Sequence, residues 1–430
     1  MPLVKTFLKG GIEVDSFRNL TGAHPIRPLF IPSMAIVPLM QYPGAKAEWV
    51  VEEGTLVGED QILALGSGPR ELAVHSPIPG RIVEFREITL PWGTVTTAAF
   101  VRLEGEFSRT GRPSVKREWA LVPDNEIKDR IRAAGIFLES SPLDPRRSLE
   151  GLSSSIDAFV VNALQPEPYL TLSYHLQRER TADLVEGVRI LQKLFRPVQT
   201  HFVSDPDHPE EWEQLFSGLL DGVQLHSLQF KYPQAQEGFL LRTIGVRVGP
   251  GRGDQVLILD VASVLAVRDA VVEGKAQVEK HVVVSGRGIR NPGVYRVRVG
   301  TPLFQLLKDA GGIKPGDHKV LIGGPFQGQV VDSLTTPILK STQAVLVLEK
   351  GEVNQGVERP CIRCGQCVDA CPVGLEPLNL HKAIVSGNFS LARSEGLGLC
   401  IECGICSYIC PSRVPLVSQF QAAKEASLGS

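Results

Sequence analysis

The sequence has no cysteine before residue 361 and none after residue 410, although eight lie between those positions. A disulfide framework usually belongs to a short secreted chain with cysteines spread along it, so this distribution argues against one. No run of about 18 apolar residues occurs, and we therefore expect no helix that spans a bilayer. The formal net charge of −2 argues against a general nucleic-acid-binding protein.

The composition is that of an ordinary globular protein. Hydrophobic residues make up 43% and charged residues 21% of the 430 positions, which suits about three domains with real cores. The first residues, MPLVKTFLKGGIEVDS, combine a short apolar run with an early acid, unlike a secretory signal. Thiols without disulfide partners are typical of a reducing compartment, so we expect a cytoplasmic location.

The eight cysteines form two copies of one spacing, C-x2-C-x2-C-x3-C-P. The first copy contains Cys361, Cys364, Cys367 and Cys371, and the second contains Cys400, Cys403, Cys406 and Cys410. This spacing is the ligand pattern of ferredoxins with two [4Fe-4S] clusters, in which the fourth cysteine of each copy binds the other cluster. The sequence therefore predicts one cluster on Cys361, Cys364, Cys367 and Cys410, and a second on Cys371, Cys400, Cys403 and Cys406.

Structural zinc is the main alternative for a segment rich in cysteine. Zinc sites usually have two C-x2-C pairs separated by about a dozen residues or more, whereas each copy here is an unbroken run of four cysteines. The spacing therefore favours iron–sulfur clusters. Two such clusters close together predict one-electron transfer.

Four segments of different character follow one another along the chain. Residues 1–115 contain short strands separated by glycine and proline turns, and this pattern resembles a barrel-sandwich domain of the biotinyl/lipoyl type. The predicted hairpin tip at 66–74 has Arg70 but no lysine, so we do not expect a covalent carrier. Residues 116–276 predict a doubly wound α/β domain, because strands alternate with helices. The strands are expected at 156–163, 198–205 and 255–261, and the helices at 182–195 and 262–274.

The last two segments differ again. Residues 277–350 resemble the β-grasp module called SLBB, with a short helix at 301–310 that ends at two glycines. Residues 351–430 contain the cysteine motifs, joined by helical segments in a twin [4Fe-4S] ferredoxin domain. A polar tail is expected after residue 420. The predicted fold class is thus multidomain, with α/β and α+β units.

The order of these modules resembles that of the RnfC family, whose members belong to the Rnf electron transport complex, a membrane-bound assembly that couples electron transfer to ion pumping. The stretches that carry the resemblance are residues 10–57, EPYLT (167–171), KYPQAQE (231–237), 266–293, IGGPFQG (322–328), CIRCGQCVDACPVGLEP (361–377) and CIECGICSYICPSRVPL (400–416). The resemblance covers nearly the whole chain. The chain is more distantly similar to the flavin-bearing NADH subunit of respiratory complex I and to the microcompartment cobalamin reductase.

The resemblance implies a peripheral subunit on the cytoplasmic face of the cell membrane. Its partners would be the membrane-embedded and peripheral subunits of the complex, with a soluble redox carrier as a further candidate. The resemblance also implies an FMN in the α/β domain, which NADH reduces before electrons pass to the clusters. Gly135, Asn162 and Glu167 are the residues that match the family's flavin site.

This chain departs from the family at the glycine-rich stretch of that flavin site. The family has a stretch similar to G-x-G-G-A-G-F-P, whose glycines let backbone N–H groups approach the ring and the phosphate. Residues 134–142 read AGIFLESSP here, so Gly135 is the one glycine left and Glu139 adds negative charge. A carboxylate repels a phosphate charge by about 1 kcal/mol at 4 Å even in water. The sequence therefore argues against FMN in the family's manner.

The favoured interpretation is an electron-transfer subunit with two [4Fe-4S] clusters and no assigned catalytic residue. Electrons would then enter from another redox protein, flavin or subunit. Two alternatives stay open. One is a complete NADH:FMN dehydrogenase subunit of the same complex, and the other is an assembly scaffold whose clusters are mainly structural.

Overall fold

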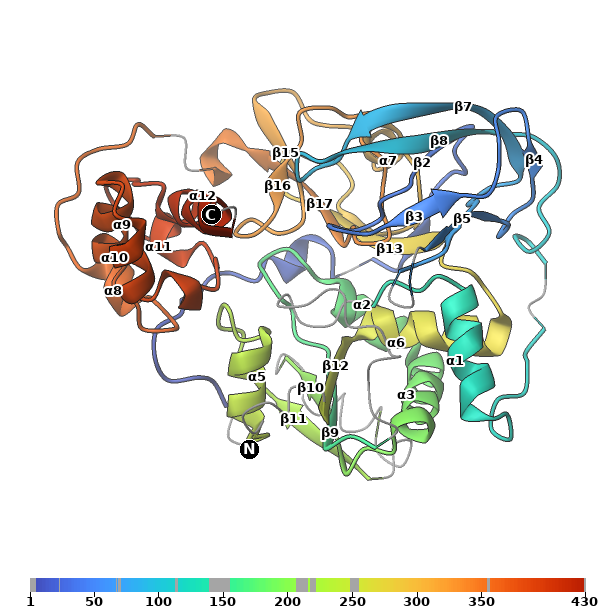
Figure 1. Cartoon of the computed structure of the whole chain (residues 1–430), viewed down its shortest axis with the longest axis horizontal. Coiled ribbons are helices and arrows are strands. Elements are labelled where there is room, and N and C mark those ends of the chain that lie inside the picture. The colour runs from blue at the N-terminus through green and yellow to red at the C-terminus, as the bar shows by residue number, and fades with distance from the viewer. Residues whose placement is uncertain are drawn as a thin grey trace.

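The structure is a computed structural model, and it describes residues 5–22, 24–66, 68, 71–112, 115–138, 155–205, 216, 222–247, 255–353 and 356–428. Figure 1 shows four units. A barrel of short strands lies beside a six-stranded sheet at the top, a parallel sheet with its helices lies below them, and a group of helices lies at the left.

Two antiparallel sheets form the first unit, in the orders β2-β8-β7-β4 and β3-β5-β6. Their strands are β2 (Met34–Pro38), β3 (Ala47–Trp49), β4 (Leu56–Val57), β5 (Ile62–Gly66), β6 (Val74–His75), β7 (Gly80–Thr89) and β8 (Val95–Leu103). Alternate residues of both sheets, such as Val37, Leu63 and Val101, are fully buried in one shared core. The barrel-sandwich prediction is confirmed. Arg70, at the predicted hairpin tip, lies outside the described residues.

A parallel sheet with the order β11-β10-β9-β12 forms the centre of the second unit. Its elements are α1 (Asp124–Ala133), β9 (Ala158–Asn162), α2 (Leu172–Glu179), α3 (Thr181–Phe195), β10 (Gln199–Ser204), β11 (Val223–Ser227), α5 (Glu237–Ile244), β12 (Val256–Asp260) and α6 (Val261–Arg268). Phe159 and Val161 pack with α2, α3 and α6, whereas Ala158 and Val160 pack with α5 on the other face (Figure 1). The doubly wound prediction is therefore confirmed.

The helix expected at 262–274 changes type along its length. The α-helix ends at Arg268 and one π-helical turn, η4 (Asp269–Glu273), continues it. The Asp260 side chain accepts a hydrogen bond of 2.7 Å from the Ser263 N–H and so caps the start of α6.

The third unit is a six-stranded sheet with the order β1-β14-β13-β17-β15-β16. Its elements are β1 (Arg27–Pro28), β13 (Glu279–Ser285), β14 (Gly293–Arg298), α7 (Leu303–Asp309), β15 (His318–Ile322), β16 (Gln329–Val330), β17 (Ala344–Glu349) and the short helix η5 (Lys350–Glu352). Helix α7 confirms the helix expected at 301–310. Strand β1 comes from the first predicted domain but pairs in parallel with β14. The domain boundaries at 115, 276 and 350 stay a prediction.

The cysteine motifs lie in a helical unit at the end of the chain. Its helices are α8 (Gln366–Asp369), α9 (Pro377–Val385), α10 (Phe389–Ser394), η6 (Leu397–Leu399), α11 (Ile405–Tyr408) and α12 (Leu416–Leu428). The expected polar tail after residue 420 is wrong, because α12 continues through it. Phe420 and Ala423 are buried against Leu380 of α9, and this apolar contact holds the last helix in place.

The N-terminal segment, residues 5–14, fastens this helical unit to the parallel sheet. Ile12 pairs with Tyr232, and the Gly11 N–H donates a 2.9 Å hydrogen bond to the Ala370 carbonyl. A side chain at Gly10 would collide with the helical unit, because a Cβ there would lie 2.5 Å from the Cys371 carbonyl oxygen. The segment therefore bridges two units that are far apart in sequence. None of the described helices is long and apolar enough to cross a bilayer.

Candidate iron–sulfur centres

The two cysteine loops repeat the same backbone conformation. Arg363 (φ +56°) and Gly365 (φ +81°) in the first loop match Glu402 (φ +55°) and Gly404 (φ +77°) in the second. Left-handed residues alternating with right-handed ones turn backbone N–H groups inward, which suits anionic sulfur. A non-glycine residue in this conformation costs about 1–2 kcal/mol, so the packing of the unit must hold the loops in shape.

The cysteines line two separate cavities. The first, of about 80 Å³, is lined by Cys361, Cys364, Cys367 and Cys410, which we call the outer set. The second, of about 20 Å³, is lined by Cys371, Cys400, Cys403 and Cys406, which we call the inner set. This grouping corresponds to the crossed spacing. Each set thus presents four thiols to one space, the arrangement that a cubane cluster requires.

The sulfur atoms have backbone donors but no cationic partner of their own among the described contacts. The Arg363 N–H lies 3.4 Å from Cys361 Sγ, and the Leu375 N–H lies 3.3 Å from Cys371 Sγ. Burial raises the pKa of Cys403 and of Cys406 to about 12, so these groups need a strongly positive ligand to become thiolates. Iron would supply that charge, and the donor set therefore fits iron–sulfur clusters.

The two sets lie at different depths. Cys361 and Cys364 of the outer set are exposed, whereas Cys371 and Cys403 of the inner set are each 8% exposed. The outer set therefore faces solvent and the inner set faces the rest of the protein.

Two aromatic side chains connect the inner set to the other units. The Tyr232 hydroxyl, from the α/β unit, donates a 2.8 Å hydrogen bond to the Cys403 carbonyl. The ring of Phe326, from the six-stranded unit, stacks on Tyr232 with centroids 4.5 Å apart and contacts Tyr408 of α11. Gly404 leaves room for this contact, because a Cβ there would lie 3.0 Å from the Phe326 carbonyl oxygen. The inner set is therefore packed against both neighbouring units.

A third cavity, of about 390 Å³, lies next to this contact at the carboxyl ends of β9 and β12. Ligands of open α/β sheets usually bind at such strand ends. Two of the three predicted flavin residues, Asn162 and Glu167, line this cavity, while Gly135 does not. We call it the strand-end cavity.

The three predicted flavin residues already have partners in the fold. Asn162 Nδ2 donates to the Ala235 carbonyl at 2.9 Å, and a Glu167 oxygen accepts from the Phe326 N–H at 2.7 Å. The Gly135 carbonyl accepts from Nζ of the buried Lys340 at 2.7 Å. Gly135 (φ +58°) has no room for a side chain, since a Cβ would lie 2.2 Å from a backbone oxygen. Each residue thus has a structural role.

The charge of the strand-end cavity does not fit the phosphate of FMN. Its described lining includes the carboxylates Glu167, Glu237 and Asp260 but no lysine, arginine or histidine. A phosphate site normally offers cations or free backbone N–H groups, and Glu167 already accepts the N–H groups of Phe326 and Gln327. Residues 139–142 of the altered glycine stretch lie outside the described residues. FMN in the family's manner stays a prediction that these contacts argue against.

Glu167 gives the protein a pH-dependent stability that can be tested. Burial raises the pKa of Glu167 from 4.5 to about 7. Between those values the folded protein binds more protons than the unfolded chain, so stability falls as pH rises, by roughly 3 kcal/mol in total. In Glu167→Gln the amide oxygen still accepts both N–H groups, and we expect this decline to flatten. Urea unfolding midpoints from pH 4.5 to pH 8 measure it.

The matched control is Glu53→Gln, which removes an exposed carboxylate. This variant should keep the pH slope of the wild type. An unchanged slope in Glu167→Gln would show that the Glu167 carboxylate is already ionised in the folded protein.

Three family models match the chain. An RnfC barrel sandwich hybrid domain covers residues 6–106, an SLBB domain covers 282–329, and a 4Fe-4S dicluster domain covers 360–415. The last match supports iron–sulfur clusters as the cofactors of this chain. Ligation by the individual cysteines stays a prediction.

Curated relatives extend the match to nearly the full chain. The RnfC subunit of the ion-translocating oxidoreductase complex of Rhodobacter capsulatus is 31% identical over 436 residues, which cover 98% of this chain and 83% of the relative. The chain belongs to the RnfC family. A second member, from the proton-translocating ferredoxin:NAD(+) oxidoreductase complex of Clostridium ljungdahlii, is 29% identical over 87% of this chain and 83% of its own length.

Not all members of the RnfC family have the same length. The Yersinia enterocolitica member is 32% identical over 382 residues, which cover 86% of this chain but 54% of that member. Among solved structures, a chain of the NAD+-reducing [NiFe]-hydrogenase in its air-oxidized state has a TM-score of 0.50 and 16% identity, covering 71% of this chain and 66% of that chain. At this identity the likeness shows the fold alone.

Sequence reasoning missed the aromatic contact behind the inner set. Tyr232 and Phe326 both lie in stretches that carry the resemblance to the RnfC family, KYPQAQE and IGGPFQG. Each aromatic residue follows or precedes turn residues, where an apolar ring has no local reason to be buried. That position was the available signal, because a ring in a turn usually packs against another part of the fold.

Proposed function

We propose that this chain is a peripheral electron-transfer subunit of a membrane-bound, ion-translocating oxidoreductase complex. It relays single electrons through two [4Fe-4S] clusters, which supply one-electron redox chemistry when bound. The observation that carries the proposal is the pair of four-cysteine cavities at different depths. A relay needs one redox centre near the surface and one near the interior, and the outer and inner sets provide both positions.

The residues around the inner set hold it and keep water away. Ile405 and Ala370 are buried beside Cys403, and Tyr232 fixes the loop through its hydrogen bond to the Cys403 carbonyl. Solvent exposure and hydrogen bonding set cluster potentials, so this dry setting should separate the inner potential from the outer one.

The outer set is where we place exchange with a partner. Cys361 and Cys364 are exposed, and Ile362 between them is 67% exposed. An exposed apolar residue beside a redox centre suits transient docking of a redox protein. The names of the relatives support membrane subunits of the complex as the neighbours of this chain, and we place the chain on the cytoplasmic face.

Crossed ligation gives a direct test of the two sites. Purified, anaerobically reconstituted protein is expected to contain about eight iron atoms and eight sulfides and no stoichiometric flavin. In Cys410→Ser the outer cluster should be lost and the inner one retained, although Cys410 belongs to the second motif. Iron and sulfide analysis with EPR of the dithionite-reduced protein measures this.

Cys371→Ser is the matched variant, because Cys371 is the corresponding cysteine of the first motif. It should lose the inner cluster and retain the outer one. Zinc in place of iron, or stoichiometric FMN that NADH reduces, would contradict the proposal as stated.

A further inference from the structure

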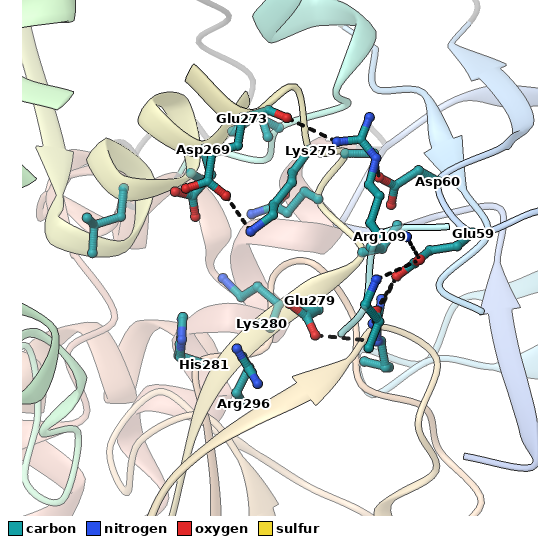
Figure 2. A pocket seen from close by; sticks show the side chains of 18 of the residues that line it. Glu59, Asp60, Arg109, Asp269, Glu273, Lys275, Glu279, Lys280, His281 and Arg296 are labelled. Carbon is teal, nitrogen blue, oxygen red and sulfur yellow. Dashed lines mark hydrogen bonds and ion pairs between the residues drawn. The ribbon is translucent and has the colours of Figure 1, made fainter. Parts of the chain in front are cut away.

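The largest cavity among those described lies away from the cysteines and is lined by three different units. It measures about 830 Å³. Figure 2 shows that its lining comes from the connection after the barrel-sandwich unit, from the end of α6 with η4, and from β13 and β14. We call it the junction cavity. Its volume is within the range of about 300–1,000 Å³ that is typical of small-molecule sites.

The junction cavity has an excess of positive charge. Eight lysine and arginine residues line it, against five carboxylates. Each carboxylate already has an ion pair: Glu59 and Glu279 with Arg298, Asp60 with Arg109, Asp269 with Arg180, and Glu273 with Lys275. The carboxylates therefore leave part of the positive charge without a counterion among the described residues.

That remaining charge is concentrated on β13 and β14. Glu279 and Arg298 are directly opposite one another on the two strands and form an ion pair of 3.4 Å. The next opposed pair on this face is His281 and Arg296, which has no carboxylate. Lys280, 7% exposed, lies between Glu279 and His281 and also lines the cavity. Lys280 and Arg296 have no ion pair with any described carboxylate.

The potential at this wall is positive. Burial, followed by the charges of Arg180, Lys280 and Arg296, lowers the pKa of His281 to about 3. Figure 2 shows Lys280, His281 and Arg296 gathered on one side of the cavity. Like charges opposed without an anion destabilise a sheet, so an anionic ligand would offset a cost that the fold otherwise carries.

An apolar surface completes the lining. Leu176 of α2, Leu265 of α6, Ile136 and Val278 are buried residues that border the same cavity. A simple inorganic anion would leave this surface unused. A ligand with a flat or apolar part next to its negative charge would contact both walls.

We propose that the junction cavity binds a phosphorylated small molecule of nucleotide size. The phosphate groups would lie against Arg296, His281 and Lys280, and the apolar part against Leu176 and Leu265. A guanidinium binds two phosphate oxygens at once, which favours Arg296 as the main contact. The site differs from the strand-end cavity, whose described lining has carboxylates and no cation. The proposal does not depend on the redox function of the cysteine sets.

The test is a calorimetric titration of the reconstituted full-length protein with ADP. The wild type is expected to bind, and Arg296→Gln should weaken binding by at least about tenfold, because charge-assisted hydrogen bonds to phosphate are among the stronger ones. Arg296 is exposed, so the fold should tolerate the change. The matched control is Lys319→Gln, which removes an exposed charge from β15 of the same sheet, outside the cavity.

A second variant and a second titrant make the outcome decisive. His281→Gln should also weaken ADP binding, while iron content and EPR spectra stay those of the wild type. Pyrophosphate should bind at least about tenfold more weakly than ADP, because it cannot use the apolar wall. Absence of ADP binding at millimolar concentration, equal affinity in Arg296→Gln, or equal affinity for pyrophosphate would overturn the proposal.

Discussion

Replacing Cys403 by serine is expected to abolish electron transfer through the chain while leaving the protein folded and assembled. Serine is a poor ligand for the iron of such clusters, so the inner set should lose its cluster. Cys361 and Cys364 belong to the separate outer set and should keep theirs. For a complex like that named for the Clostridium ljungdahlii relative, ferredoxin-dependent reduction of NAD+ in membranes would measure the loss.

The control for this variant is Tyr408→Phe in the same helix, α11. The Tyr408 side chain is 58% exposed, and the change keeps the ring that contacts Phe326. It should therefore retain wild-type electron transfer. If the Cys403→Ser chain failed to assemble with its partners, yet any assembled complex were fully active, the clusters would be mainly structural and the relay model would be wrong.

Replacing Arg268 by methionine is expected to cause the largest loss of stability among single substitutions outside the cysteine unit. Arg268 is 1% exposed. Its guanidinium forms ion pairs with Glu186 at 3.0 Å and with Asp183 and Asp269 at 3.1 Å each, and it also pairs with Glu273. Removing one partner of a buried ionic network leaves uncompensated charge and costs about 3–5 kcal/mol. Urea unfolding with a fitted midpoint measures the difference.

The matched substitution is Arg132→Met on α1. Arg132 is an exposed arginine paired with Asp129 at 3.2 Å, and surface pairs contribute about 0–1 kcal/mol. The contrast between the two variants isolates burial from charge. A change below about 1 kcal/mol in Arg268→Met would mean that the surrounding acids find other partners, such as Arg180.

The sequence was most informative where local spacing determines structure. Cys361, Cys364 and Cys367 are close in the chain, so their grouping follows from the loop itself. The strand at 156–163 and the helix at 182–195 were also predictable, because alternation and helical spacing are local patterns. The parallel sheet followed from their order.

Contacts between distant residues were not predictable in the same way. Glu167 matched the family's flavin pattern, yet its carboxylate accepts N–H groups of residues more than 150 positions away. No local pattern shows that Tyr232 and Phe326 would stack beside Cys403. The positive wall of the junction cavity has the same origin, since His281 and Arg296 face one another only through strand pairing.

The N-terminal segment has a consequence for the order of events during biosynthesis. Ile12 and Gly11 form their hydrogen bonds with Tyr232 and Ala370, and Gly10 packs on Cys371. The ribosome makes these partners hundreds of residues later, so the segment must wait for nearly the entire polypeptide before it can dock. Until then the inner thiols lack part of their cover. The interval after the second motif is made and before the segment docks is therefore the natural time for iron to be inserted.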